Sequence, residues 1–265
     1  MINSNECRFN CLLSEKKPFQ RLYQDFWLHK VWALVVSLHK ILEPILSLMR
    51  GERGRSNMFT GIVQGVAEVV AVKELEEFRT HVVALPEALR EGLTIGASVA
   101  HNGVCLTVTA IEDGNVSFDL MRETLRLTNL GAIAPGQCVN IERAARFGDE
   151  IGGHSMSGHI ICMANVVAIE EAPNNRRLWF SLPEKVAKFV FEKGYIGVDG
   201  ISLTVGDVRP AGDGAGVEFS VNLIPETLAR TVLKDRLLGD RVNIEIDPQT
   251  QVIVETVERV LASRL

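Results

Sequence analysis

Two short segments of this sequence carry hydroxyl and thiol groups of the kind that hold or activate a small ligand. Cys105-Leu106-Thr107 follows a predicted tight turn at Asn102-Gly103, and Ser202-Leu203-Thr204 follows a similar turn at Asp199-Gly200. Small side chains, hydroxyls and exposed backbone amides suit a flat heteroaromatic ring with a polyol arm. Each residue also has a plainer explanation, because Thr is a good strand former and Cys packs as a small core hydrophobe.

Two further pairs of segments correspond in the same way. Asp119–Thr124 corresponds to Asn222–Thr227, and Gly61-Ile62-Val63 corresponds to Gly158-His159-Ile160. We expect all three pairs to line the mouths of two similar ligand sites.

Familiar catalytic and cofactor motifs are missing from the sequence. Gly153–Gly158 has the spacing of a phosphate-binding loop, but His159-Ile160 follows where Lys and then Ser or Thr are required. His154 and His159 are too far apart for one helix face to present both to a metal, and no His-Glu-x-x-His occurs. There is also no G-x-S-x-G, and no G-x-G-x-x-G follows a strand. The sequence therefore supports neither a metal hydrolase nor a nucleotide-dependent enzyme, and no metal site is predicted.

The corresponding segments belong to a long internal repeat. From Met58 to Val108 each residue aligns with the one 97 places later without a gap, and the match resumes at a shift of 103 from Glu123 onward. Solenoid units run to about 20–50 residues, so this period predicts a duplicated domain with two similar sites.

Each copy contains short alternating or β-branched segments separated by turn residues. About six such strands per copy predict a small closed antiparallel barrel. In the first copy we expect strands at Val66–Val72, His81–Leu85, Ser98–Ala100, Cys105–Ile111, Val116–Leu120 and Cys138–Glu142.

Helical pattern is scarce. Pro183–Glu192 is predicted to be a short helix packed on its barrel, with Val186, Phe189 and Val190 on one face. The tail Gln249–Leu265 is predicted to form a helix with an apolar stripe, covered either by the same helix of another subunit or by its own barrel.

Composition excludes several classes of protein. The net charge of −5 argues against a nucleic-acid partner, which requires clustered Lys and Arg. Five cysteines without a C-x-x-C pair indicate reduced thiols and a cytoplasmic location. Charged residues and Pro44 interrupt the apolar run 31–38 before it could span a membrane, so no membrane segment is expected.

Residues 1–57 lie outside the repeat. An amphipathic helix near 22–49 that binds a membrane surface or a partner is one interpretation. We favour the other, an appended segment that is not part of the fold, because the repeated unit begins at Met58.

Several motifs closely resemble the riboflavin synthase family. They are Met-Phe-Thr-Gly-Ile-Val at 58–63, Asn-Gly-Val-Cys-Leu-Thr-Val at 102–108, Gly-Gly-His-Ser-Met-Ser-Gly-His at 152–159, the run 193–205 and Ile-Pro-Glu-Thr-Leu at 224–228. The resemblance covers residues 58 to about 262 and does not extend to residues 1–57.

The resemblance implies an all-β fold of two tandem six-stranded Greek-key barrels with a C-terminal helix that drives trimer formation. We place the first lumazine-binding barrel at 58–154, the second at 155–247 and the oligomerisation helix at 248–265. It also implies cofactor-free dismutation of two molecules of 6,7-dimethyl-8-ribityllumazine to riboflavin and 5-amino-6-ribitylamino-uracil. In the family, each active site lies between the first barrel of one subunit and the second barrel of its neighbour. The enzyme that supplies lumazine, lumazine synthase, is a possible partner.

We interpret the places where the copies differ as the places where their roles divide. His159 is our candidate general base or proton shuttle, because imidazole exchanges protons readily near neutral pH, although a structural histidine at the barrel end is the alternative. Ser98 and Cys105 are expected to position or activate the water or nucleophile, and Lys193 and Asp199 to orient the second substrate. Phe59 and the segment after it are expected to lie against the first site. A non-catalytic lumazine- or flavin-binding protein is the alternative function.

The complete set of expected substrate-binding residues is Phe59, Gly61, Ile62, Val63, Cys105, Leu106, Thr107, Asp119, Leu120, Met121, Arg122, Glu123, Thr124, Gly158, His159, Ile160, Lys193, Asp199, Ser202, Leu203, Thr204, Asn222, Leu223, Ile224, Pro225, Glu226 and Thr227.

Overall fold

The computed structural model describes residues 58–212 and 214–263. The expected N-terminal extension, with its candidate helix near 22–49, lies outside the described residues.

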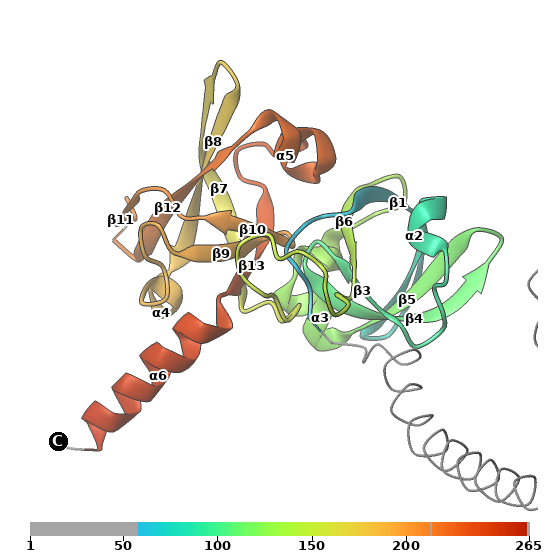
Figure 1. Ribbon diagram of the computed structural model, residues 1–265, viewed down its shortest axis with the longest axis horizontal. Helices are drawn as coiled ribbons and strands as arrows, with labels where there is room; N and C mark the ends of the chain where they lie inside the picture. The colour runs from blue at the N-terminus through green and yellow to red at the C-terminus, as the bar shows by residue number, and fades with distance from the viewer. Residues whose placement is uncertain (1–57, 213, 264–265) are drawn as a thin grey trace, which may run out of the picture. The chain divides into compact units, whose positions relative to one another are not determined.

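The first copy forms a closed barrel of six antiparallel strands. In barrel order these are β1 (Gly65–Leu75), β2 (Phe78–Ala84), β5 (Asn115–Met121), β4 (Val104–Glu112), β3 (Ser98–His101) and β6 (Cys138–Arg143), which pairs back with β1 (Figure 1). Alternate residues of β1 and β5 are buried, as in a sheet with one apolar face, whereas β3 and β6 are buried over consecutive residues. The predicted strands and the closed barrel are confirmed for this copy.

The second copy repeats the strand order, but it forms a seven-stranded sheet and not the closed six-stranded barrel that was expected, because one strand is divided in two. We call this copy the second barrel. Its sheet order is β10 (Ile201–Thr204), β9 (Tyr195–Val198), β13 (Arg241–Ile246), β7 (Cys162–Ala172), β8 (Asn175–Pro183), β12 (Gly216–Leu223) and β11 (Val208–Pro210). The two outer strands β10 and β11 are consecutive in the chain and together correspond to β4 of the first copy.

The division falls where β4 already carries a bulge, between Val108 and Ala110. At the corresponding place in the second copy, the amides of Gly206 and Asp207 bond to the Ser220 carbonyl and hydroxyl, at 2.7 and 3.0 Å. A Cβ at Gly206 would lie 2.6 Å from that hydroxyl, so the close approach requires glycine here. The bulge in β4 of the first copy therefore corresponds to the break between β10 and β11 in the second.

Short helices connect the strands. They are α2 (Glu87–Arg90), α3 (Arg122–Leu127), η1 (Asn129–Ala132), α4 (Glu184–Ala187), α5 (Pro225–Arg230) and η2 (Val232–Asp235). The helix predicted over Pro183–Glu192 is correct in place but wrong in length. Phe189 and Val190 continue in turns that bond to Val186 and Ala187, three residues back, and all three apolar side chains of that segment reach the core.

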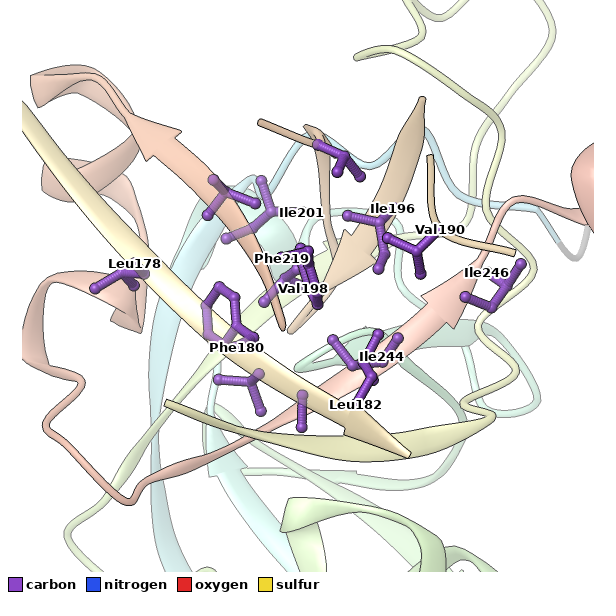
Figure 2. Close-up of a cluster of buried hydrophobic side chains, with 14 of the residues drawn as sticks. Leu178, Phe180, Leu182, Val190, Ile196, Val198, Ile201, Phe219, Ile244 and Ile246 are labelled. Carbon is purple, nitrogen blue, oxygen red and sulfur yellow. The ribbon is translucent and has the colours of Figure 1, made fainter. Parts of the chain in front are cut away.

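Each barrel has its own apolar interior. In the first, Phe118, Leu120 and Ile141 are completely buried. In the second, Phe180, Phe219 and Ile244 occupy the centre, as Figure 2 shows. Two complete cores explain why the repeat unit needs about 100 residues.

The chain ends in α6 (Pro248–Ala262), which projects from the second sheet (Figure 1). The Asp247 carboxylate caps its first turn by accepting the amide protons of Gln249 and Thr250. Val254 packs against the barrel core, whereas the predicted stripe is exposed, with Ile253 at 64% and Val257 at 51%. No helix in the described part of the chain is long and apolar enough to cross a membrane.

Candidate functional site

The two copies meet at an approximate twofold axis. Phe59 bridges Met156, its own counterpart 97 residues later, through reciprocal backbone hydrogen bonds of 2.8 and 2.9 Å. Gly103 meets its counterpart Gly200 so closely that a Cβ on Gly103 would lie 2.6 Å from the Gly200 nitrogen. Backbone approach of this kind, at φ of +79° and +85°, is possible only for glycine.

Around this axis the chain exchanges two segments, 59–63 and 156–160, which we call the crossing segments. The Cys105 amide of the first barrel bonds to the Gly158 carbonyl at 3.1 Å, and the Ser202 amide of the second barrel bonds to the Gly61 carbonyl at 3.0 Å. Val63 is buried in the core of the second barrel, whereas Ile160 packs against the core of the first. Each barrel is therefore completed by a segment from the other copy.

Buried carboxylates hold the crossing segments in place. Glu142 accepts hydrogen bonds from the amide and hydroxyl of Thr60, and Glu245 accepts the same pair from Ser157. Burial raises the pKa of Glu142 to about 7, against the lowering effect of the Thr60 hydrogen bonds, and it also raises the pKa of Glu245.

The first barrel site consists of Ser98, Cys105 and Thr107 with Gly158 and His159 of a crossing segment. A Cβ on Gly158 would lie 2.5 Å from the Cys105 Cβ, so this glycine lets the segment lie directly on the strand. Burial raises the pKa of the Cys105 thiol, although a hydrogen bond from Ser98 lowers it, and the thiol is therefore protonated at neutral pH. His159 is exposed, and Glu245 interacts with it electrostatically.

The second barrel site consists of Tyr195, Ser202 and Thr204 with Gly61 and Ile62, and it is overlaid by His154. Nδ1 of His154 lies 2.7 Å from the Ser202 hydroxyl, which also accepts the His154 amide at 3.2 Å. The imidazole stacks on Tyr195 with ring centroids 5.6 Å apart. Burial lowers the pKa of His154, so its ring is neutral at neutral pH.

Within Asp119–Thr124 and Asn222–Thr227, side chains of three kinds occur. Leu120 and Leu223 are completely buried in the barrel cores. Outside these two segments, Leu106 is buried and Leu203 is partly buried. The exposed side chains of the two segments are Met121, Arg122, Glu123, Asn222, Ile224, Pro225 and Glu226. Arg122, Glu123 and Glu226 form ion pairs with neighbouring residues of the chain. Asp119 accepts the Thr80 hydroxyl at 2.7 Å, while Thr124 and Thr227 are half-buried.

Among the expected residues, Lys193 and Phe59 take contrasting positions. Lys193 is exposed at a φ of +65° and bonds through its amide to the Val205 carbonyl. Phe59 is buried at the axis with Ala100 and Met156, and it packs beside Cys105 of the first barrel. The segment after Phe59 does not stay there, because Gly61 and Val63 contact the second barrel.

Asp199 lies apart from both sites and is completely buried between the barrels. Its carboxylate accepts Nη2 of Arg236 at 2.6 Å, Nδ2 of Asn129 at 2.9 Å and the Asn243 amide at 2.8 Å. Burial raises its pKa, against the lowering effect of Arg236. This geometry gives the side chain a structural position and no surface with which to touch a substrate.

His154 was not among the site residues predicted from the sequence. The Gly-Gly-His triplet at 152–154 was the available signal, because a Cβ on Gly153 would lie 2.6 Å from the Ser202 hydroxyl oxygen. In the described residues, no group of three or more His, Cys, Asp or Glu is arranged to hold a metal ion.

The lumazine binding domain family matches this chain twice, over residues 60–144 and 157–247. The chain is thus a tandem pair of lumazine binding domains. It is 60% identical over 208 residues to the riboflavin synthase of Escherichia coli strain K12, covering 78% of this chain and 95% of that protein. The riboflavin synthase of Buchnera aphidicola subsp. Schizaphis graminum is 44% identical over 205 residues, or 77% and 96% of the two chains. The chain belongs to the riboflavin synthase family.

Solved structures show the same fold. A crystal structure of LumP complexed with riboflavin superimposes with a TM-score of 0.64 at 25% identity, and it covers 71% of this chain and 98% of that chain.

Proposed function

We propose that this chain is a riboflavin synthase, which converts two molecules of 6,7-dimethyl-8-ribityllumazine into riboflavin and 5-amino-6-ribitylamino-uracil. One lumazine loses a four-carbon unit and the other gains it, so the reaction balances without an oxidant or a cofactor. The observation that carries the proposal is that both copies keep a complete barrel site, with a thiol or hydroxyl at Cys105 and Ser202. A reaction between two identical molecules needs two similar sites.

The nature of the ligand is supported by relatives of this chain. LumP has been crystallised with riboflavin and with 6,7-dimethyl-8-(1'-D-ribityl) lumazine. The exposed hydroxyls of Thr107 and Thr204 offer donors and acceptors for such a ring and its ribityl arm.

The chemistry asks little of the protein beyond positioning and one modest base. Loss of a proton from the C7 methyl group leaves an anion spread over the pteridine ring. We assign His159 as the base, with Ser98 and Cys105 beside the acceptor ring. Stacking the two substrates face to face supplies much of the remaining rate through proximity and orientation.

We further propose that the protein acts in the cytoplasm as a homotrimer. The support is the exposed stripe of α6, in which Ile253, Val257 and Leu261 are each more than half exposed, because such a stripe is stabilised by covering it. In this assembly the first barrel of one subunit would face the second barrel of its neighbour. Association with lumazine synthase would deliver the substrate directly.

Conversion without an added cofactor tests the function. The purified full-length chain is incubated with 6,7-dimethyl-8-ribityllumazine alone, and riboflavin is followed by visible absorbance and fluorescence. We expect one riboflavin for every two lumazines consumed. Tight binding without any conversion would overturn the proposal and favour a lumazine carrier.

A further inference from the structure

Cys105 and Ser202 occupy equivalent strand positions in the two barrel sites, but their side chains have different hydrogen-bond partners. In the first, Ser98 bonds to Cys105. The counterpart of Ser98 in the second copy is Tyr195, which stacks against His154, and His154 bonds to Ser202. His154, which lies in the linker between the barrels, thus gives Ser202 the hydrogen bond that Ser98 gives Cys105 in the first copy.

We propose that His154 is a positioning residue that fixes the Ser202 hydroxyl as a hydrogen-bond donor to an acceptor atom of the ring bound at the second barrel site. The proposal rests on the proposed function only for the identity of that ring. It assigns to the second site a carbonyl oxygen or ring nitrogen directed at Ser202.

The direction of the hydrogen bond between His154 and Ser202 follows from the other hydrogen bonds that these two side chains make or lack. The Ser202 oxygen already accepts the His154 amide. Nε2 of His154 is buried, and no described residue offers it a hydrogen bond. A buried N–H without a partner is rarer in proteins than a bare acceptor, so the tautomer with its proton on Nδ1 is favoured. Nδ1–H then donates to Ser202, and the hydroxyl proton is left to point at a ligand.

The surroundings keep this arrangement fixed. His154 is only 7% exposed, and its ring is held flat against Tyr195 with an interplanar angle of 16°. Gly153 allows the linker to reach Ser202, and the Gly152 amide ties the linker to the Thr60 carbonyl at 2.9 Å. A donor that is oriented before the ligand arrives loses little entropy on binding.

Two substitutions separate a hydrogen-bonding role from mere filling of space. His154→Leu keeps bulk but removes Nδ1, whereas His154→Asn places an amide nitrogen near the position of Nδ1. The full-length chain would be titrated with riboflavin, the product, by fluorescence quenching. We expect His154→Leu to weaken riboflavin binding at one class of site roughly tenfold, the effect of one hydrogen bond, and His154→Asn to restore most of it.

A double-mutant cycle tests whether His154 acts through Ser202. In a Ser202→Ala background, His154→Leu should have no further effect, whereas in a Cys105→Ala background its effect should remain roughly tenfold. Equal losses in both backgrounds, or equal losses from Leu and Asn, would overturn the proposal and leave His154 as packing.

The outcome is independent of the proposed function. If the unaltered chain binds riboflavin but makes none, the proposed activity fails, while a barrel-specific effect of His154→Leu still supports the positioning role. If the unaltered chain is active and His154→Leu binds riboflavin with unchanged affinity, only the positioning role fails.

Discussion

Replacing Arg236 with isoleucine would remove one member of the buried ion pair between the barrels. Asp199 has no exposed surface, and Arg236 is its charged partner at 2.6 Å, with a side chain that is 18% exposed. Breaking a buried pair costs about 3–5 kcal/mol, because the remaining charge stays in a poorly solvated place. Burial already raises the pKa of Asp199, so the unpaired carboxyl can take up a proton. We therefore expect a loss of unfolding free energy at the lower end of this range, about 3 kcal/mol. For a protein of this size that lowers Tm by roughly 6–12 °C.

The first copy shows how to repair this loss. Asn102 and Ile133 occupy the places that correspond to Asp199 and Arg236. Asn102 has a φ of +44° and Asp199 one of +45°, so asparagine fits the backbone conformation at both. We therefore expect Asp199→Asn to rescue Arg236→Ile, with a coupling energy of about 2 kcal/mol or more.

Urea unfolding at pH 7 of both single variants and the double variant measures the coupling. Arg230→Ile is the matched control, because Arg230 and its partner Glu226 are each 65% exposed, and it should cost under about 1 kcal/mol. Additive losses within about 0.5 kcal/mol would refute the reasoning. Asp199→Asn should also leave turnover unchanged; a large loss of turnover in a stable variant would restore the substrate-orienting role that the sequence suggested.

Three further outcomes follow from the same geometry. His159→Ala should lower kcat by about 10²–10⁴-fold in a riboflavin fluorescence assay, and an unchanged kcat would remove its role as base. Gly103→Ala should cost more than about 2 kcal/mol in urea unfolding, whereas Gly136→Ala, with an equally positive φ but open space around it, should cost only about 1 kcal/mol. Burial lowers the pKa of His81 to about 4 and that of His101 to about 3, so their unfolded forms bind protons first and stability falls as pH drops from about 6.5 toward 4. His81→Leu with His101→Val, the residues of the second copy, should reduce that loss in urea midpoints measured at pH 7 and pH 5; equal losses in both proteins would contradict it.

Much of the fold could be predicted because the strand pattern is local. The alternation of apolar and polar residues and turn residues such as Asn102-Gly103 act over a few positions, and the repeat shows these patterns in two copies. Helix length was less predictable. The segment after Pro183 places Val186, Phe189 and Val190 in the core whether it coils regularly or in turns, so periodicity alone could not fix where the helix ended.

The exchange of the crossing segments could not be predicted from the sequence. Val63 and Ile160 are similar apolar residues at equivalent positions, so their side chains do not indicate which barrel core each one enters. Backbone hydrogen bonds across the axis hold each segment on the barrel that it enters. The pattern of side chains in the sequence carries no information about these bonds. The importance of His154 was hidden for a related reason, because its counterpart position in the first copy is Asn57, outside the matched segments.

The exchange changes what the differences between the copies mean. If each segment stayed with its own barrel, His159 would accompany Ser202, and Ile62 would accompany Cys105. In the structure the assignment is reversed, since the segment that carries His159 lies on the strand of Cys105 and the segment that carries Ile62 lies on the strand of Ser202. The first site then combines an exposed imidazole with a thiol, and the second combines a hydroxyl with the buried imidazole of His154. With His159 as the proposed base, we expect proton transfer at the first site and fixed hydrogen bonding at the second. Two identical substrates need such an asymmetry if one is to donate carbon and the other to accept it.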